Sequence, residues 1–123
     1  MRLKELALRG VQVRPDGELV SATGRMIKPY SIKGKRYFKL QHFDKQIRLP
    51  YERVRYVLLH PDDEEAYFDN AIYKPHPFKP DVVRIERHTW ALMKKYHITL
   101  EDFCSLTRHE ILLKYGVREI YKL

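Results

Sequence analysis

Residues 33–43 read KGKRYFKLQHF, and in this stretch cationic side chains alternate with aromatic ones behind a Lys-Gly turn. Successive side chains of a β-strand point to opposite faces, so a strand over residues 36–43 has two defined faces. One face would carry Arg36, Phe38, Leu40 and His42, and the other Tyr37, Lys39, Gln41 and Phe43. Both faces mix polar and apolar side chains, which is typical of an antiparallel sheet with a solvated side.

The neighbouring segments predict that this strand belongs to a β-meander. Short alternating segments are separated by the turn signals Asp16-Gly17, Thr23-Gly24, Lys33-Gly34 and Asp44-Lys45. The expected strands cover residues 11–14, 18–22, 26–31, 36–43 and 46–49.

A short helix is expected directly after the meander, because Pro50 suits the first turn of a helix. It covers residues 51–59, with Val54, Val57 and Leu58 pointing inward. The pattern predicts that Arg53 and Arg55 point outward.

The second half of the chain predicts a helical lobe behind a connection. Residues 61–81 contain the acidic run DDEE and a segment with three prolines, which favour irregular structure. Residues 82–123 show apolar side chains at helical spacing from Val82 to Tyr96. Two further helices are expected behind Thr99 and Thr107, the second with a capping box, and Gly116 is expected to end the last helix.

Together these segments predict an α+β fold in which an N-terminal antiparallel β-meander and a short helix precede a C-terminal lobe of three helices. The expected divisions are a basic meander with its helix over residues 1–60, an acidic and proline-rich connection over 61–81, and a helical lobe over 82–123. At 123 residues the chain is expected to form one compact unit.

Charge is distributed unequally between the two halves. Residues 1–60 hold 14 Lys and Arg against 5 Asp and Glu, whereas residues 61–123 hold 10 against 11. A basic half with interleaved aromatic residues favours a polyanionic partner, and nucleic acid before others. The single Cys104 and the lack of a long apolar run favour a soluble cytoplasmic protein that does not bind a membrane.

The motifs of residues 19–63 resemble the small β module of phage and mobile-element HNH endonucleases. Residues 19–29 (LVSATGRMIKP) resemble the "V-S-x-x-G-R" hairpin of that family, and residues 34–40 (GKRYFKL) resemble its "G-x-Y-x-x-x-L" strand. Residues 52–63 (ERVRYVLLHPDD) resemble the helix that follows and its exit. The resemblance implies a phage or bacterial protein that binds DNA.

The chain departs from that family at the catalytic residues. Glu52 stands where the family places its first catalytic histidine, and the downstream stretch that supplies the metal ligands is missing. The resemblance therefore implies a binding module without the nuclease centre.

Residues 86–123 are similar in pattern to the C-terminal domain of the bacterial RNA polymerase α subunit. Residues 98–103 (ITLEDF), 105–107 (SLT), 111–113 (ILL) and 115–117 (YGV) carry the similarity. The family's DNA-contacting positions correspond to His88 and Ala91, so the lobe is expected to pack or to bind a protein partner rather than DNA.

No catalytic group, metal site or cofactor is predicted. The six histidines, at positions 42, 60, 76, 88, 97 and 109, form no close ligand pair. Cys104 lies in an apolar helical pattern and is expected to be a buried thiol.

The leading hypothesis is a non-catalytic nucleic-acid-binding protein that uses a basic sheet face, with DNA favoured over RNA. Phosphate contacts are expected from Arg25, Lys28, Lys33, Lys35, Arg36, Lys39 and Arg48. Tyr30 and Tyr37 are the stacking candidates, and Arg53 and Arg55 are expected to enter a groove.

Two alternatives remain open on the sequence. One is a small regulator that binds a host nucleic-acid enzyme, and the other is a divergent metal-dependent nuclease. Tyr and Trp grouped on the neutral lobe would favour a protein partner, whereas aromatic residues interleaved with Lys and Arg on the sheet would favour nucleic acid.

Overall fold

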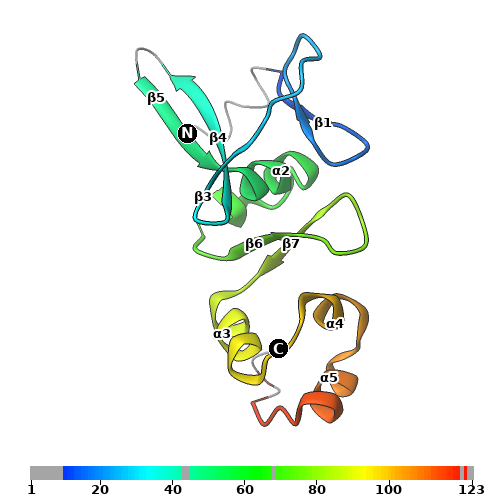
Figure 1. Ribbon diagram of the computed structural model, residues 1–123. Helices are drawn as coiled ribbons and strands as arrows, with labels where there is room; N and C mark the ends of the chain where they lie inside the picture. The colour runs from blue at the N-terminus through cyan, green and yellow to red at the C-terminus, as the bar shows by residue number, and fades with distance from the viewer. Residues whose placement is uncertain (1–9, 43–44, 68, 120, 122–123) are drawn as a thin grey trace.

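The computed structural model describes residues 10–42, 45–67, 69–119 and 121, and it confirms the predicted α+β class. The N-terminal half contains β1 (Gln12–Val13), β2 (Leu19–Val20), β3 (Tyr30–Ile32), β4 (Lys35–His42), β5 (Lys45–Pro50) and α2 (Tyr51–Leu59). The 3-10 helix η1 (Glu64–Tyr67) and the strands β6 (Ile72–Pro75) and β7 (Val82–Ile85) follow. The chain then forms α3 (Arg87–Tyr96), α4 (Leu100–Ser105) and α5 (Arg108–Tyr115). Figure 1 shows the β6–β7 hairpin between the N-terminal sheets and the three C-terminal helices.

The expected single meander is divided into two sheets. β1 and β2 form one antiparallel pair, and β3, β4 and β5 form a separate sheet in that order. Between β2 and β3, the described residues form one isolated β-bridge, which pairs Val20 with Met26. Pro29 has no N–H to donate, so it interrupts the ladder before β3 begins at Tyr30.

Helix α2 packs its inner face against both N-terminal sheets. Tyr51, Val54 and Val57 are buried, and they join Leu19 and Phe38 in one hydrophobic cluster, the N-terminal core. The Tyr51 hydroxyl accepts a hydrogen bond from the Leu19 N–H at 3.2 Å and donates one to Glu18 Oε2 at 2.9 Å. These two bonds connect the start of α2 to β2.

Gly17, in the turn between β1 and β2, has φ +88° and lies against Arg55 and Pro80. An added Cβ would lie 2.7 Å from Arg55 Nη2 and 3.2 Å from the Pro80 carbonyl oxygen. Gly17→Ala is therefore expected to cost more than the roughly 1–2 kcal/mol of a left-handed backbone alone. Urea unfolding will test this against Gly24→Ala, where φ is +84° and, flanking residues aside, no described residue has an atom within 4 Å of the added Cβ. Equal losses in the two variants would show that the close approach at Gly17 is harmless.

The β6–β7 hairpin corrects the predicted start of the helical lobe. Residues 82–85 were expected to begin a helix, but they form β7, and α3 begins at Arg87. Ile72 pairs with Ile85 and Lys74 pairs with Val83, and the β-branched residues Val82, Val83 and Ile85 suit a strand. Part of the predicted connection, residues 72–75, is thus the strand β6.

The hairpin has a hydrophobic environment on each side. Ile72, Val83 and Ile85 pack on a second cluster, the C-terminal core, which includes Leu92, Met93, Ile98, Ile111 and Val117. Tyr73 packs on the N-terminal core instead. This alternation follows from the two-residue period of a strand.

The predicted starts of α4 and α5 and the predicted end of α5 are confirmed. The Thr99 side chain accepts a hydrogen bond from the Asp102 N–H, and Thr107 and Glu110 form a complete capping box at α5. Gly116 ends α5 in the left-handed conformation, with φ 68°. No described helix has the length and apolar character that spanning a membrane requires.

Candidate nucleic-acid interface

The outer face of the β3–β4–β5 sheet brings together two tyrosines and two cations. Tyr30 pairs with Tyr37 across β3 and β4, and Lys39 pairs with Arg48 across β4 and β5. The two tyrosine ring centroids are 5.9 Å apart. Lys39 Nζ lies 4.6 Å from the centroid of Tyr30, and the Arg48 guanidinium carbon lies 5.8 Å from the centroid of Tyr37. We call this set the tyrosine face.

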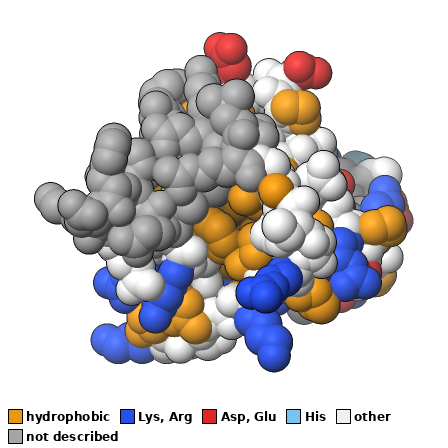
Figure 2. Space-filling view, turned by 90° about the horizontal axis from the view of Figure 1, so that it is seen from above, with side chains coloured by type: hydrophobic (Ala, Val, Ile, Leu, Met, Phe, Trp, Pro, Cys, Tyr) orange, Lys and Arg blue, Asp and Glu red, His pale blue; other side chains and the backbone are white. Residues whose placement is uncertain are grey.

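Four further predicted cations are exposed, two on the connection between β2 and β3 and two at the end of the β3–β4 hairpin. They are Arg25, Lys28, Lys33 and Lys35. Lys33 and Gly34 form the tip of the β3–β4 turn with φ 52° and 79°, which places Lys33 and Lys35 at its end. None of the four has an ion pair with an acidic residue in the described part of the chain. Figure 2 shows Lys and Arg side chains next to hydrophobic ones across the lower part of this end of the molecule.

Arg36 points to the opposite face of β4, toward α2. Its Nε donates to Glu52 Oε1 at 3.1 Å, and its guanidinium carbon lies 4.7 Å from the ring centroid of Tyr51. Burial lowers the pKa of Arg36, but the bond to Glu52 and its charge outweigh this, and the net pKa is raised. The guanidinium is thus partly exposed but already paired with a carboxylate, so the expected phosphate contact from Arg36 is not supported.

The expected outward orientation of Arg53 and Arg55 is wrong. Arg55 is 4% exposed, and its Nη1 donates to Glu52 Oε1 at 3.3 Å. Arg53 donates from Nε to the Ala66 carbonyl at 3.0 Å and from Nη2 to Asp69 Oδ1 at 2.7 Å. The acidic residues that bind these arginines occupy the positions that a phosphate would take.

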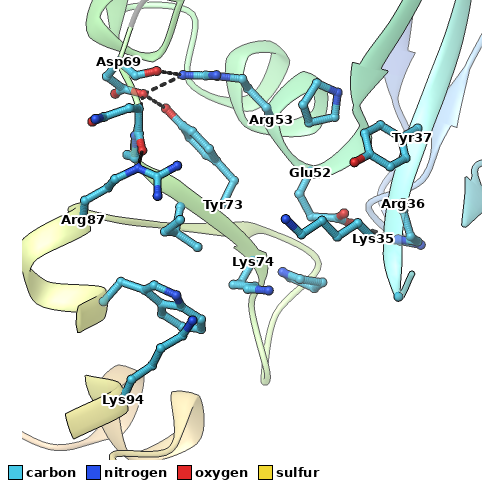
Figure 3. Close-up of a pocket in the computed structure, with 17 residues that line it drawn as sticks. Lys35, Arg36, Tyr37, Glu52, Arg53, Asp69, Tyr73, Lys74, Arg87 and Lys94 are labelled. Carbon is cyan, nitrogen blue, oxygen red and sulfur yellow. Dashed lines mark hydrogen bonds and ion pairs between the residues drawn. The ribbon is translucent and has the colours of Figure 1, made fainter. Parts of the chain in front are cut away.

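A groove of about 810 Å³ lies between the tip of the β3–β4 hairpin, the start of α2, β6 and α3. We call it the central groove. Figure 3 shows Lys35, Arg36 and Tyr37 on one side of it and Lys94 and Arg87 on the other, with Lys74 between them. This site was not predicted from the sequence, because its two walls come from segments that are separated by about half of the chain.

The sole tryptophan, Trp90 on α3, is partly exposed in the wall of the central groove. Lys74 Nζ and Lys94 Nζ lie 5.2 Å and 5.3 Å from its ring centroid. The spacing of Trp90 and Lys94, four residues apart on a helix, was a local signal for part of this arrangement. The contribution of Lys74 depends on the β6–β7 hairpin.

Two acidic residues line the central groove, and both are paired with arginines. Glu52 binds Arg36, and Asp69 binds Arg53. Arg87 donates from Nε to the Asn70 carbonyl at 2.6 Å, a contact with a neutral group. Lys35, Lys74, Arg87 and Lys94 therefore give the groove an excess of positive charge that no described carboxylate cancels.

The described residues do not form a metal site, since no group of three or more His, Cys, Asp or Glu side chains is placed to hold an ion. Cys104 is partly buried, and burial together with the charge of Glu101 raises the pKa of its thiol. A raised pKa lowers the thiolate fraction and with it the reactivity of the sulfur.

Comparison with known proteins adds no relative: no family model, no curated protein and no solved structure matches the chain.

Proposed function

We propose that the protein binds nucleic acid through the tyrosine face and the exposed cations around it, without catalysing a reaction. The observation that carries the proposal is the interleaving of Tyr30 and Tyr37 with Lys39 and Arg48 on one sheet face. Aromatic rings accept stacked bases and neighbouring cations accept phosphates, so this combination suits a nucleic-acid strand. The predicted preference for DNA over RNA and the resemblance of residues 19–63 to HNH β modules remain predictions.

The distribution of aromatic residues favours nucleic acid over a protein partner. A protein-binding regulator was expected to group Tyr and Trp on the neutral helical lobe. In that lobe the Tyr96 hydroxyl binds Glu119 at 2.8 Å, the Tyr115 hydroxyl binds Asp102, and Trp90 is flanked by two lysines. All three rings are partly buried against the C-terminal core, so only part of each ring is available to a protein partner.

The salt dependence of binding tests the proposal. Six of the predicted cations are exposed on the β3–β4–β5 sheet or on the connection that leads into it: Arg25, Lys28, Lys33, Lys35, Lys39 and Arg48. If all six contact phosphates, log affinity is expected to fall against log salt with a slope of roughly −4 on a single strand and roughly −5 on a duplex. Fluorescence anisotropy of labelled oligonucleotides over a range of NaCl concentrations measures this slope. A flat response, or no retention near physiological salt, would reject the proposal.

The double variant Lys39→Ala with Arg48→Ala removes the two cations that lie over the tyrosines. We expect the slope on a single strand to become shallower by about 1.4, because each lost phosphate contact contributes about 0.7. Lys79→Ala with Lys114→Ala is the matched control, since it removes the same charge outside the tyrosine face. An equal change in both double variants would show that net charge alone governs binding.

A further inference from the structure

We propose that the central groove binds one nucleotide of a single-stranded nucleic acid, with the base against Trp90 and the phosphate held by Lys74, Lys94 and Lys35. This inference rests on the proposed function and adds the helical lobe to the binding site. It also assigns a phosphate-binding role to a lobe whose near-neutral charge predicted none.

The lysines at Trp90 differ from other lysines of the C-terminal lobe. Lys95 Nζ binds Glu119 and Lys114 Nζ binds Asp102, each at 2.7 Å. Among the described residues, Lys74 and Lys94 have no such carboxylate, and they lie over the tryptophan ring instead. A cation–π contact at an exposed site is weak, so both ammonium groups can turn to a phosphate at little cost.

The indole and the two ammonium groups together match the parts of a nucleotide. A partly exposed aromatic ring offers a stacking surface to a base, and every base has a face that can stack on it. The ammonium groups beside the ring are placed for the phosphate attached to that base. Turning the lysines away from the indole uncovers the stacking surface as the phosphate is bound.

The size and form of the groove favour a single strand. Its volume of about 810 Å³ lies in the range of sites that hold one small ligand. Bases of a duplex are stacked on one another and cannot lie flat on a protein ring, whereas an unpaired base can.

The groove is continuous with the tyrosine face. Tyr37 belongs to the tyrosine face and also lines the groove. Lys35, at the hairpin tip, lines the groove next to it. Figure 3 shows both side chains on the wall opposite Lys94. A strand stacked on Tyr30 and Tyr37 can therefore continue past Lys35 to Trp90.

Tryptophan fluorescence tests the inference, because Trp90 is the sole tryptophan of the chain. We expect a short oligothymidylate to quench the emission of Trp90 with the same midpoint as its anisotropy change, and the corresponding dT·dA duplex to leave the emission unchanged. Lys74→Ala with Lys94→Ala is expected to weaken binding of the oligothymidylate about tenfold and to make the salt slope shallower by about 1.4. The control Lys79→Ala with Lys114→Ala is expected to keep most of the affinity.

The possible outcomes separate the two proposals. The groove site would be overturned if oligothymidylate bound without changing the emission of Trp90 and bound the Lys74→Ala with Lys94→Ala variant as tightly as the wild type. This result would not contradict binding at the tyrosine face. Equal quenching by the duplex would overturn the assignment to a single strand. Absence of any anisotropy change would overturn the proposed function itself, and quenching by an acidic peptide alone would assign the groove to a protein partner instead.

Discussion

Glu52→Ala is expected to lower the free energy of unfolding by about 3–5 kcal/mol, the loss that follows when one partner of a buried ion pair is removed. Glu52 is 8% exposed, and its Oε1 accepts hydrogen bonds from Arg36 and from Arg55. Without the carboxylate, the Arg55 guanidinium stays in a buried position, and the Asp81 carbonyl, at 3.3 Å, is the one acceptor that the described residues still offer it. Since small domains have about 5–15 kcal/mol in total, the variant is expected to be close to unfolding.

Urea unfolding of three variants tests the role of Glu52. Glu65→Ala is the matched control, because that side chain is 82% exposed and its pair with Arg84 is a surface contact. Replacing the pair by Glu52→Leu with Arg55→Met is expected to recover part of the loss, since it leaves no buried charge. A loss in Glu52→Ala no larger than in Glu65→Ala would contradict the structural role of this carboxylate.

Asp69→Asn is expected to lower the free energy of unfolding by about 2–3 kcal/mol. This loss is smaller than for a fully buried ion pair, because the side chains of Asp69, Arg53 and Arg84 are 16–21% exposed. Asp69 Oδ1 accepts bonds from Arg53 at 2.7 Å and from the Tyr73 hydroxyl at 2.8 Å. Its Oδ2 accepts from Arg84 Nε at 2.8 Å and from Nη2 at 2.6 Å. One carboxylate thus connects α2, β6 and β7, and its loss leaves two arginines without this partner.

The pH dependence of stability checks the same cluster. Burial raises the pKa of Asp69, but hydrogen bonds from Tyr73 and Arg84 outweigh it, and the net pKa lies below the ordinary value of 3.8 for an aspartate. A lowered pKa contributes stability above pH 3.8 that is lost as the pH falls through the folded-state value. We expect the difference between the wild type and Asp69→Asn to be constant near neutral pH and to shrink in acid.

The alkaline side gives an independent check. Burial and the bond to Asp69 raise the pKa of Tyr73 from 10.0 to about 12. Its stabilising contribution is therefore fully present below pH 10.0 and is lost as the pH rises toward about 12. Asp62→Asn, at an exposed position, is the control that should leave the losses of stability in acid and in alkali unchanged.

Elements with local signals were predicted well from the sequence. The α2 boundaries follow from Pro50 and the apolar spacing behind it, and the two threonine caps define α4 and α5. β7 was missed because the spacing of Val82 and Ile85 also fits a helix. Only the pairing with β6, which a local pattern does not reveal, decides between the two.

Part of the candidate site was likewise predictable from the sequence, and part of it was not. Alternation along β4 correctly separated Arg36 and Phe38 from Tyr37 and Lys39, because that period is fixed by the strand itself. The charge of a side chain does not reveal whether a partner in the fold neutralises it. The ion pairs of Arg36, Arg53 and Arg55 with acidic residues could therefore be found only in the tertiary structure.

The β6–β7 hairpin packs on both cores, and this limits the fragments into which the chain can be cut. A two-stranded sheet is marginal on its own and needs packing to persist. Here one side is covered by the N-terminal core and the other by the C-terminal core, so excision of either half strips one side of the hairpin. Neither half is therefore a suitable fragment for dissecting the molecule, and point substitutions in the intact chain are the means to separate the tyrosine face from the groove.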